Sequence, residues 1–166
     1  MKHVFGLLAI VALLGAGCAP TSAIDTPHVP KENAMSYHTN IVKETQDNEN
    51  FRRVLFTGPN SQLVVMSIPA GGEIGAETHK YTEQTLFFLS GSGEAELDGK
   101  IFPVIAGDVV VVTPGTKHNF RNTGKQPLKV YTVYAPPNHI DGRVHRTKAD
   151  ADADTADEAV GEAAPR

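Results

Sequence analysis

Short apolar runs separated by turn residues dominate the middle of the chain. They are rich in Val, Leu and Phe, are bounded by Gly, Pro or Asn, and cover residues 63–68, 86–89, 109–112 and 128–134. Runs of this length and composition, bounded in this way, predict β-strands rather than helices, and those over residues 63–68 and 86–89 are expected to be buried. We therefore expect an all-β fold built from antiparallel strands, either a barrel or a jelly roll.

A tight hairpin is predicted between residues 94–97 and 100–102. The two residues between these segments are Asp98 and Gly99. Asp-Gly suits the positive φ angles of a type I′ turn, which joins antiparallel strands without splaying them.

The N-terminal segment has the pattern of an export signal. Lys2 and His3 precede an apolar run, residues 4–14, that is too short for a convincing membrane span. The run ends in Leu14-Gly15-Ala16-Gly17-Cys18, which resembles the lipid-attachment box of bacterial lipoproteins, with Gly15 where an aliphatic residue is usual. We expect residues 1–18 to be a signal peptide ending at a lipidated Cys18, with a protein anchored in the bacterial cell envelope that touches the membrane only through its lipid.

The alternative is ordinary cleavage after Thr21-Ser22-Ala23, which would give a soluble periplasmic protein. Cys18 is the only cysteine of the chain, so in both cases the folded domain holds no disulfide and no thiolate ligand. Histidine, carboxylate and amide groups remain as possible metal ligands.

With 166 residues the chain has the length of one domain. We expect a flexible tether over residues 19–40, the β-barrel over residues 41–140, and a loop with a disordered Ala/Asp-rich tail over residues 141–166. The tail lacks the glycine and final glutamate of a calcium-binding loop. The formal net charge of −4 gives no indication of nucleic-acid binding.

Two spaced motifs carry the candidate chemistry. They are Gly71-x5-Glu77-x-His79-x4-Gln84-x6-Gly91 and Gly107-x5-Thr113-x-Gly115-x2-His118-x3-Asn122. The pair resembles the two motifs of small single-domain bacterial cupins of the RmlC-like superfamily. The resemblance implies an antiparallel double-stranded β-helix, the cupin jelly roll, with a divalent metal in its lumen.

Two places of the usual cupin metal shell are changed. Glu77 stands at the first histidine place and Gln84 at the glutamate place, and Thr113 replaces the usual proline. The resemblance then implies metal ligands at Glu77, His79, Gln84 and His118. A mixed nitrogen and oxygen shell suits Fe(II), Mn(II), Ni(II), Zn(II) or Cu(II), so the identity of the metal stays open.

Two alternatives bear on this site. Glu83 could replace Gln84 as a ligand after a shift by one residue, but only Gln84 preserves the six-residue gap to Gly91. The barrel could also be metal-free, with His79 and His118 simply hydrogen-bonded. Several polar groups in an apolar lumen would then need other partners.

Other polar residues have simpler interpretations. His139 and His145 could form a lid or contact a ligand, although a solvated loop is the simpler expectation. Lys117 and Arg121 alternate with His118 and are expected to face outward. A tyrosine hydroxyl could reach the lumen, although packing is the commoner role for the candidates Tyr81, Tyr131 and Tyr134.

The function implied by the resemblance is a metal-assisted reaction of the isomerase, lyase or dioxygenase type on a small oxygenated molecule. The alternative is a periplasmic module that binds a metal or small ligand without turnover. A third interpretation is a structural role. Homodimers are a possible assembly. No catalytic residue is predicted. An open cavity at the metal would favour ligand binding or catalysis, whereas a lumen filled by Phe88, Phe120 and Met66 would favour a structural role.

Overall fold

The structure of the protein is a computed structural model that describes Met1 and residues 36–163. The predicted signal peptide, Cys18 and most of the predicted tether lie outside the described residues. Within these residues, no helix combines the length and the apolar character that crossing a membrane would require.

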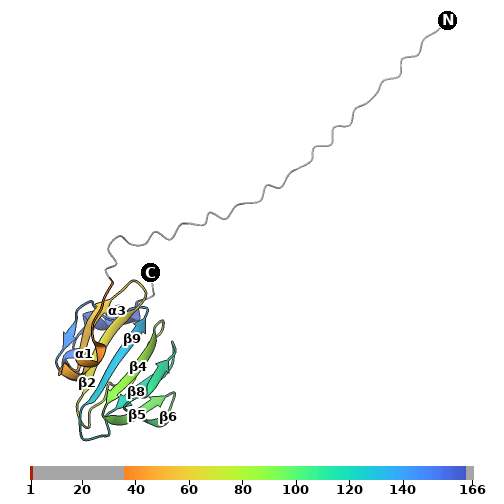
Figure 1. Ribbon diagram of the computed structural model, residues 1–166. Coiled ribbons are helices and arrows are strands. Elements are labelled where there is room, and N and C mark those ends of the chain that lie inside the picture. Colours follow the sequence, from red (N-terminus) through yellow and green to blue (C-terminus); the bar gives the residue numbers. More distant parts are fainter. Residues whose placement is uncertain (2–35, 164–166) are drawn as a thin grey trace. The chain divides into compact units, whose positions relative to one another are not determined.

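The strands form two antiparallel sheets (Figure 1). The larger sheet holds, in spatial order, β10 (Val144–His145), β1 (Arg52–Thr57), β2 (Gln62–Ile68), β9 (Leu128–Ala135), β4 (Glu83–Ser90) and β7 (Val109–Val112). The smaller sheet holds β3 (Glu77–Thr78), β8 (Lys117–Arg121), β5 (Ser92–Leu97) and β6 (Lys100–Ile105). The predicted all-β jelly roll, a double-stranded β-helix, is confirmed.

The hairpin between β5 and β6 forms at the predicted turn. Leu97 pairs with Lys100, and the two residues between them have positive φ angles of 47° at Asp98 and 78° at Gly99. Both signs match a type I′ turn, so local chemistry alone places this hairpin.

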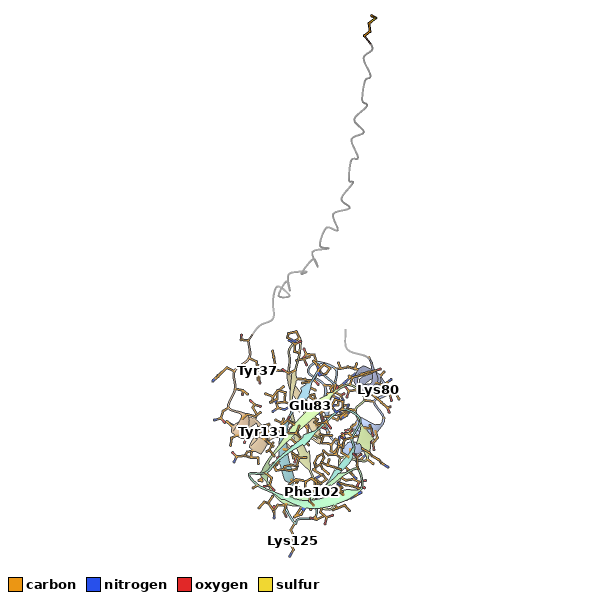
Figure 2. All side chains as sticks on the ribbon, turned by 90° about the vertical axis from the view of Figure 1, so that its right-hand side faces the viewer. Tyr37, Lys80, Glu83, Phe102, Lys125 and Tyr131 are labelled. Atoms are coloured by element: carbon orange, nitrogen blue, oxygen red, sulfur yellow. The ribbon has the colours of Figure 1, made fainter. Side chains whose placement is uncertain are left out.

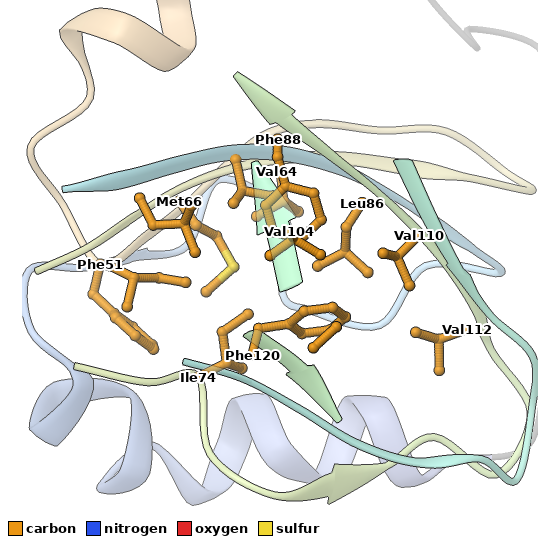
Figure 3. Packing of buried hydrophobic residues seen from close by; sticks show 14 of the residues in the cluster. Phe51, Val64, Met66, Ile74, Leu86, Phe88, Val104, Val110, Val112 and Phe120 are labelled. Carbon is orange, nitrogen blue, oxygen red and sulfur yellow. The ribbon is translucent and has the colours of Figure 1, made fainter. Parts of the chain in front are cut away.

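The core fills the space between the two sheets (Figure 3). Met66 on β2 and Leu86 and Phe88 on β4 are buried from one side, and Phe120 on β8 is buried from the other. The Phe88 and Phe120 rings lie 5.8 Å apart between centroids. Alternate residues of β4 and β9 are buried, as expected for strands with one face on the core.

Three helices accompany the described strands. Helix α1 (Ile41–Asp47) is capped by the Asn40 side chain, which accepts from the Lys43 amide, and it packs on β2, β4 and β9. Helices α2 (Lys148–Asp152) and α3 (Thr155–Glu162) follow β10.

The C-terminal segment differs from the expected disordered tail. Thr147 and Asp150 form a capping box at the start of α2, and the Asp154 side chain caps α3. Asp157 of α3 is buried against the barrel. The composition of the tail offers few apolar residues, but buried ion pairs hold it in place instead. The ordered fold thus extends well beyond residue 140.

Figure 2 shows that Lys80 lies toward the end of the barrel that carries the C-terminal helices, whereas Phe102 and Lys125 lie at the opposite end. The candidate site described next belongs to the Lys80 end.

Candidate metal centre

Strand pairing brings the two sequence motifs together. Glu77 of β3 and His118 of β8 are direct cross-strand partners. His79 follows β3, and its carbonyl oxygen accepts a hydrogen bond from the Gly115 amide at 2.8 Å. The pairing of β3 with β8, together with the hydrogen bond between Gly115 and His79, therefore positions three of the four predicted ligands.

The side chains of Glu77, His79 and His118 converge on one point. Each offers a ligand atom, and these atoms all lie within 4.8 Å of one another. Glu77 Oε1 lies 3.4 Å from His79 Nε2 and 3.3 Å from His118 Nε2. The side chain of His118 is fully buried, that of His79 is 10% exposed and that of Glu77 is 30% exposed, so the cluster opens to solvent on the Glu77 side.

Both imidazole Nε2 atoms are buried and have no hydrogen-bond partner of acceptable geometry among the described residues. Buried nitrogen atoms without partners are costly, because desolvation is not compensated. Their convergence with a carboxylate oxygen is the arrangement in which a bound cation would satisfy all three groups.

The orientation of His118 is determined by its other nitrogen. Nδ1 donates a hydrogen bond to the Thr116 carbonyl oxygen at 2.9 Å. A carbonyl can only accept, so Nδ1 carries a proton, and in the neutral ring the lone pair lies on Nε2, which faces the cluster. An outer hydrogen bond of this kind is the usual support of a metal-binding histidine.

The cluster keeps Glu77 ionised. Burial would raise the pKa of this carboxyl, but the neighbouring His118 and His79 hold it far below its usual value. Burial likewise opposes protonation of His118, and interaction with Glu77 nevertheless raises the pKa of His118. The carboxylate is thus in the charge state that attracts a cation.

Gln84 points inward and Glu83 outward. Gln84 is fully buried on β4, and its Nε2 donates to the Tyr134 hydroxyl at 2.9 Å. Its Oε1 is buried without a partner among the described residues, whereas Glu83 is exposed. The alternation along β4 thus puts the amide of Gln84, and not the carboxylate of Glu83, inside the barrel. Whether Gln84 binds a metal stays a prediction.

The three tyrosines have different surroundings. Tyr134 of β9 is buried beside the centre, 5.7 Å from the His79 ring, and burial together with the charge of Glu77 raises the pKa of its hydroxyl. Tyr131 stacks on Phe87, with ring centroids 4.8 Å apart, and Tyr81 lies under Lys80. Tyr134 therefore supplies the lumen hydroxyl.

The two basic residues of β8 face away from the centre. Lys117 is exposed, and Arg121 forms ion pairs with Glu96 and Glu73. The expectation that they point outward agrees with this geometry.

A cavity of about 670 Å³ adjoins the centre. Its wall includes Glu77 and His79 on one side and residues of α2 and α3 on another. Phe88, Phe120 and Met66 are buried in the core, and none of them lines the cavity. The packed core thus leaves room for a small molecule beside Glu77 and His79.

The expectation of a solvated loop around His139 and His145 is wrong. Both side chains are buried: His139 Nδ1 lies 2.8 Å from Asp157 Oδ2, and His145 Nε2 lies 3.0 Å from Asp154 Oδ2. Arg52 of β1 contacts Asp157 at 3.1 Å. No local sequence pattern marks Asp157 or Arg52 as functional residues. The capping pattern Thr147-x-x-Asp150, in contrast, could have indicated the C-terminal helices.

Comparison with known proteins identifies the family. Residues 64–134 match the family described as "Cupin domain". A protein from Bacillus halodurans, BH2720, whose crystal structure is known at 1.41 Å, is 39% identical, with a TM-score of 0.71 over 75% of this chain and 99% of that one. The chain belongs to the cupins.

Two further cupin relatives are more distant or only partly covered. The Bacillus subtilis protein YrkC is 43% identical over 118 residues, which are 68% of this chain and 63% of YrkC, so the chain spans less than two thirds of that relative. An oxalate-binding protein from Thermotoga maritima is 32% identical over 68 residues, or 41% of this cupin and 56% of that protein.

Proposed function

We propose that this cupin binds one divalent metal ion through Glu77, His79 and His118, with the Gln84 amide oxygen as a further ligand. The observation that supports this proposal is the convergence of three possible ligand atoms within 4.8 Å of one another. Two of them are buried imidazole nitrogens without partners among the described residues. A metal-free lumen would leave those nitrogens uncompensated, so the metal-free alternative is the costlier one.

The ion would face the cavity and hold a small oxygenated molecule there. Its ligand set leaves coordination positions for water or a ligand, and the cavity of about 670 Å³ accommodates a small molecule. When bound, the ion supplies Lewis acidity toward an oxygen ligand. The protein side chains hold the ion, exclude water on the side of the Phe120 core and limit the size of the ligand.

Catalysis is the second candidate, and the same cavity favours it. A reaction of the isomerase, lyase or dioxygenase type is compatible with such a centre, as is ligand binding without turnover, because the fold does not determine the chemistry.

Metal analysis of the purified protein tests the proposal. After reconstitution with Fe(II), Mn(II), Ni(II), Zn(II) or Cu(II) in turn and removal of free ions, we expect about one ion per chain for at least one metal. His79→Ala and His118→Ala should lose it while keeping the β-sheet circular dichroism spectrum. His38→Ala is the matched control, because His38 is exposed. Failure of every metal to bind stoichiometrically, or full retention by the double variant His79→Ala/His118→Ala, would refute the proposal.

A further inference from the structure

The cavity beside the metal centre has a second polar wall that no cupin motif contributes. Asn138 and His139, which follow β9, line it together with Asp157 of α3. His139 is 6% exposed, yet its Nε2 has no hydrogen-bond partner among the described residues. A buried polar atom without a partner, on a residue that lines a cavity, needs a partner such as a water molecule or a ligand.

The hydrogen bonds of Asp157 determine which nitrogen of His139 carries the proton. Asp157 Oδ1 accepts from the Ile140 amide at 2.7 Å, and Oδ2 accepts from Arg52 at 3.1 Å. The hydrogen bond with His139, the hydrogen bond from the Ile140 amide and the charge of Arg52 lower the pKa of Asp157 to about 2 against the effect of burial, so it is ionised. An ionised carboxylate only accepts, and therefore His139 Nδ1 donates to it at 2.8 Å and Nε2 holds a lone pair.

His139 also stays neutral. Burial lowers the pKa of its imidazole, the charge of Arg52 lowers it further, and the hydrogen bond to Asp157 only partly opposes them. Neutral imidazole with a fixed tautomer is a hydrogen-bond acceptor at Nε2.

Tyr134 lies between His139 and the metal centre. Its ring is 4.9 Å from the ring of His139 and 5.7 Å from that of His79, with near-perpendicular planes in both cases. The two imidazoles therefore flank one tyrosine and line one cavity.

The charge of the cavity wall restricts the class of molecule. The exposed carboxylates of Glu158 and Glu162 line it, whereas the carboxylate of Asp152 is paired with Lys148 and the guanidinium of Arg52 with Asp157. Lys80 also lines the cavity and is exposed. A metal ion would attract a carboxylate at the centre itself. At the wall of α3, a second carboxylate would meet Glu158 and Glu162, whereas an uncharged hydroxyl group would not be repelled.

We propose that His139 is a ligand-contacting residue: the cavity takes a small molecule that places one oxygen at the Glu77–His79–His118 centre and, at its other end, an uncharged hydroxyl group that donates a hydrogen bond to His139 Nε2. This inference rests on the proposed metal site. It differs from a purely structural role of His139, which would consist only of anchoring α3 through Asp157.

The chain offers a matched control for that structural role. His145 forms the same kind of buried pair with Asp154, the N-cap of α3, but it does not line the cavity. Substitution by asparagine keeps an N–H near the position of Nδ1 and removes Nε2. His139→Asn therefore removes the acceptor but can still donate to Asp157. His145→Asn removes the Nε2 contact with Asp154 and alters the contact with Arg52, but it changes no residue that lines the cavity.

Hydroxamic acids are suitable probes, because the hydroxamate head binds a divalent metal through its oxygens. We would load the full chain with the ion that metal analysis identifies and titrate it calorimetrically with acetohydroxamic acid. The comparison probes are ω-hydroxyalkyl hydroxamic acids of increasing chain length and their ω-carboxylate analogues. At the best length the hydroxyl arm should tighten binding by about three- to tenfold over acetohydroxamic acid, as one additional hydrogen bond would.

The gain should disappear in His139→Asn and persist in His145→Asn, and the carboxylate arm should bind more weakly than the hydroxyl arm. The inference is overturned if no chain length shows a gain, if the gain survives in His139→Asn, or if both variants lose it equally. A failure of the metal site itself looks different, because acetohydroxamic acid and the metal would then not bind at all.

Discussion

Glu77 and His118 are cross-strand partners, and Glu77 Oε1 lies 3.3 Å from His118 Nε2. The register between β3 and β8 thus joins a residue of the first cupin motif to one of the second. Glu77 also occupies one of the changed places of the family pattern. The carboxylate occupies it without loss of convergence, so the altered motif still builds a three-ligand cluster.

Metal binding should stabilise the fold. An ion that binds only the native state at about 100 times its dissociation constant adds about 2.7 kcal/mol to the free energy of unfolding. For a domain of this size we expect an increase in Tm of roughly 5–10 °C, measured by differential scanning fluorimetry. His118→Ala should show no increase, and an equal shift in this variant would place the stabilising ion elsewhere.

Substitutions at Gln84 and Glu83 together test which of the two residues supplies the ligand at the glutamate place of the cupin metal shell. Gln84→Leu should weaken metal affinity by about tenfold, because it removes a buried amide oxygen, and the exposed Glu83→Leu should leave affinity unchanged. Competition with a chromogenic chelator measures both. Tyr134→Phe is the control for the lost hydrogen bond to Gln84. The assignment of Gln84 is wrong if Glu83→Leu is the variant that loses affinity.

The buried Asp157 should make stability depend on pH in the acid range. Contacts in the native state lower its pKa from the ordinary 3.8 to about 2, so its contribution is present above pH ~4 and is lost as the pH falls toward 2. The difference corresponds to about 2 kcal/mol. We therefore expect Asp157→Asn to be less stable than the native chain at pH 7, with the two unfolding curves in urea converging near pH 2.

Asp152→Asn provides the comparison for this experiment. Asp152 is an exposed carboxylate of α2 paired with Lys148, and surface pairs contribute little. Its substitution should change stability hardly at all. Similar losses in both variants would mean that burial of Asp157 is not the cause.

Gly91 of the first motif should not tolerate a side chain. Its φ angle is +89°, and a Cβ there would lie 2.8 Å from the Pro127 carbonyl oxygen. Gly91→Ala should lower the free energy of unfolding by roughly 2 kcal/mol or more, measured in urea. Gly99→Ala, with φ +78° and no atom within 4 Å of the new Cβ, should cost only about 1 kcal/mol.

Cys18 remains a prediction of the sequence. If it is the lipidation site, intact-mass spectrometry of the protein extracted from membranes will show a chain that begins at Cys18 and carries a diacylglycerol group. The Cys18→Ser variant should then no longer be found in the membrane fraction. Recovery of a mature chain that begins at Ile24 would instead establish ordinary cleavage.

The strands and the metal motifs could be predicted from the sequence because their signals are local. Apolar runs such as residues 63–68 predict buried strands, Asp98-Gly99 predicts its turn, and the spacing of Glu77, His79 and His118 depends only on strand alternation and on the glycine frame. The preference for Gln84 over Glu83 as the inward residue follows from the same alternation.

The cavity wall opposite the candidate metal centre has no such local pattern in the sequence. Asp157 lies in an Ala/Asp-rich stretch that by composition predicts disorder, and His139 lies in a polar loop. Their pairing joins residues 18 apart along the chain, and Arg52, 105 residues from Asp157, completes it. The sequence by itself determined the barrel and the convergence of Glu77, His79 and His118. Only the tertiary structure decided that a polar tail closes the cavity, because buried ion pairs between distant residues depend on spatial approach and leave no periodic pattern in the chain.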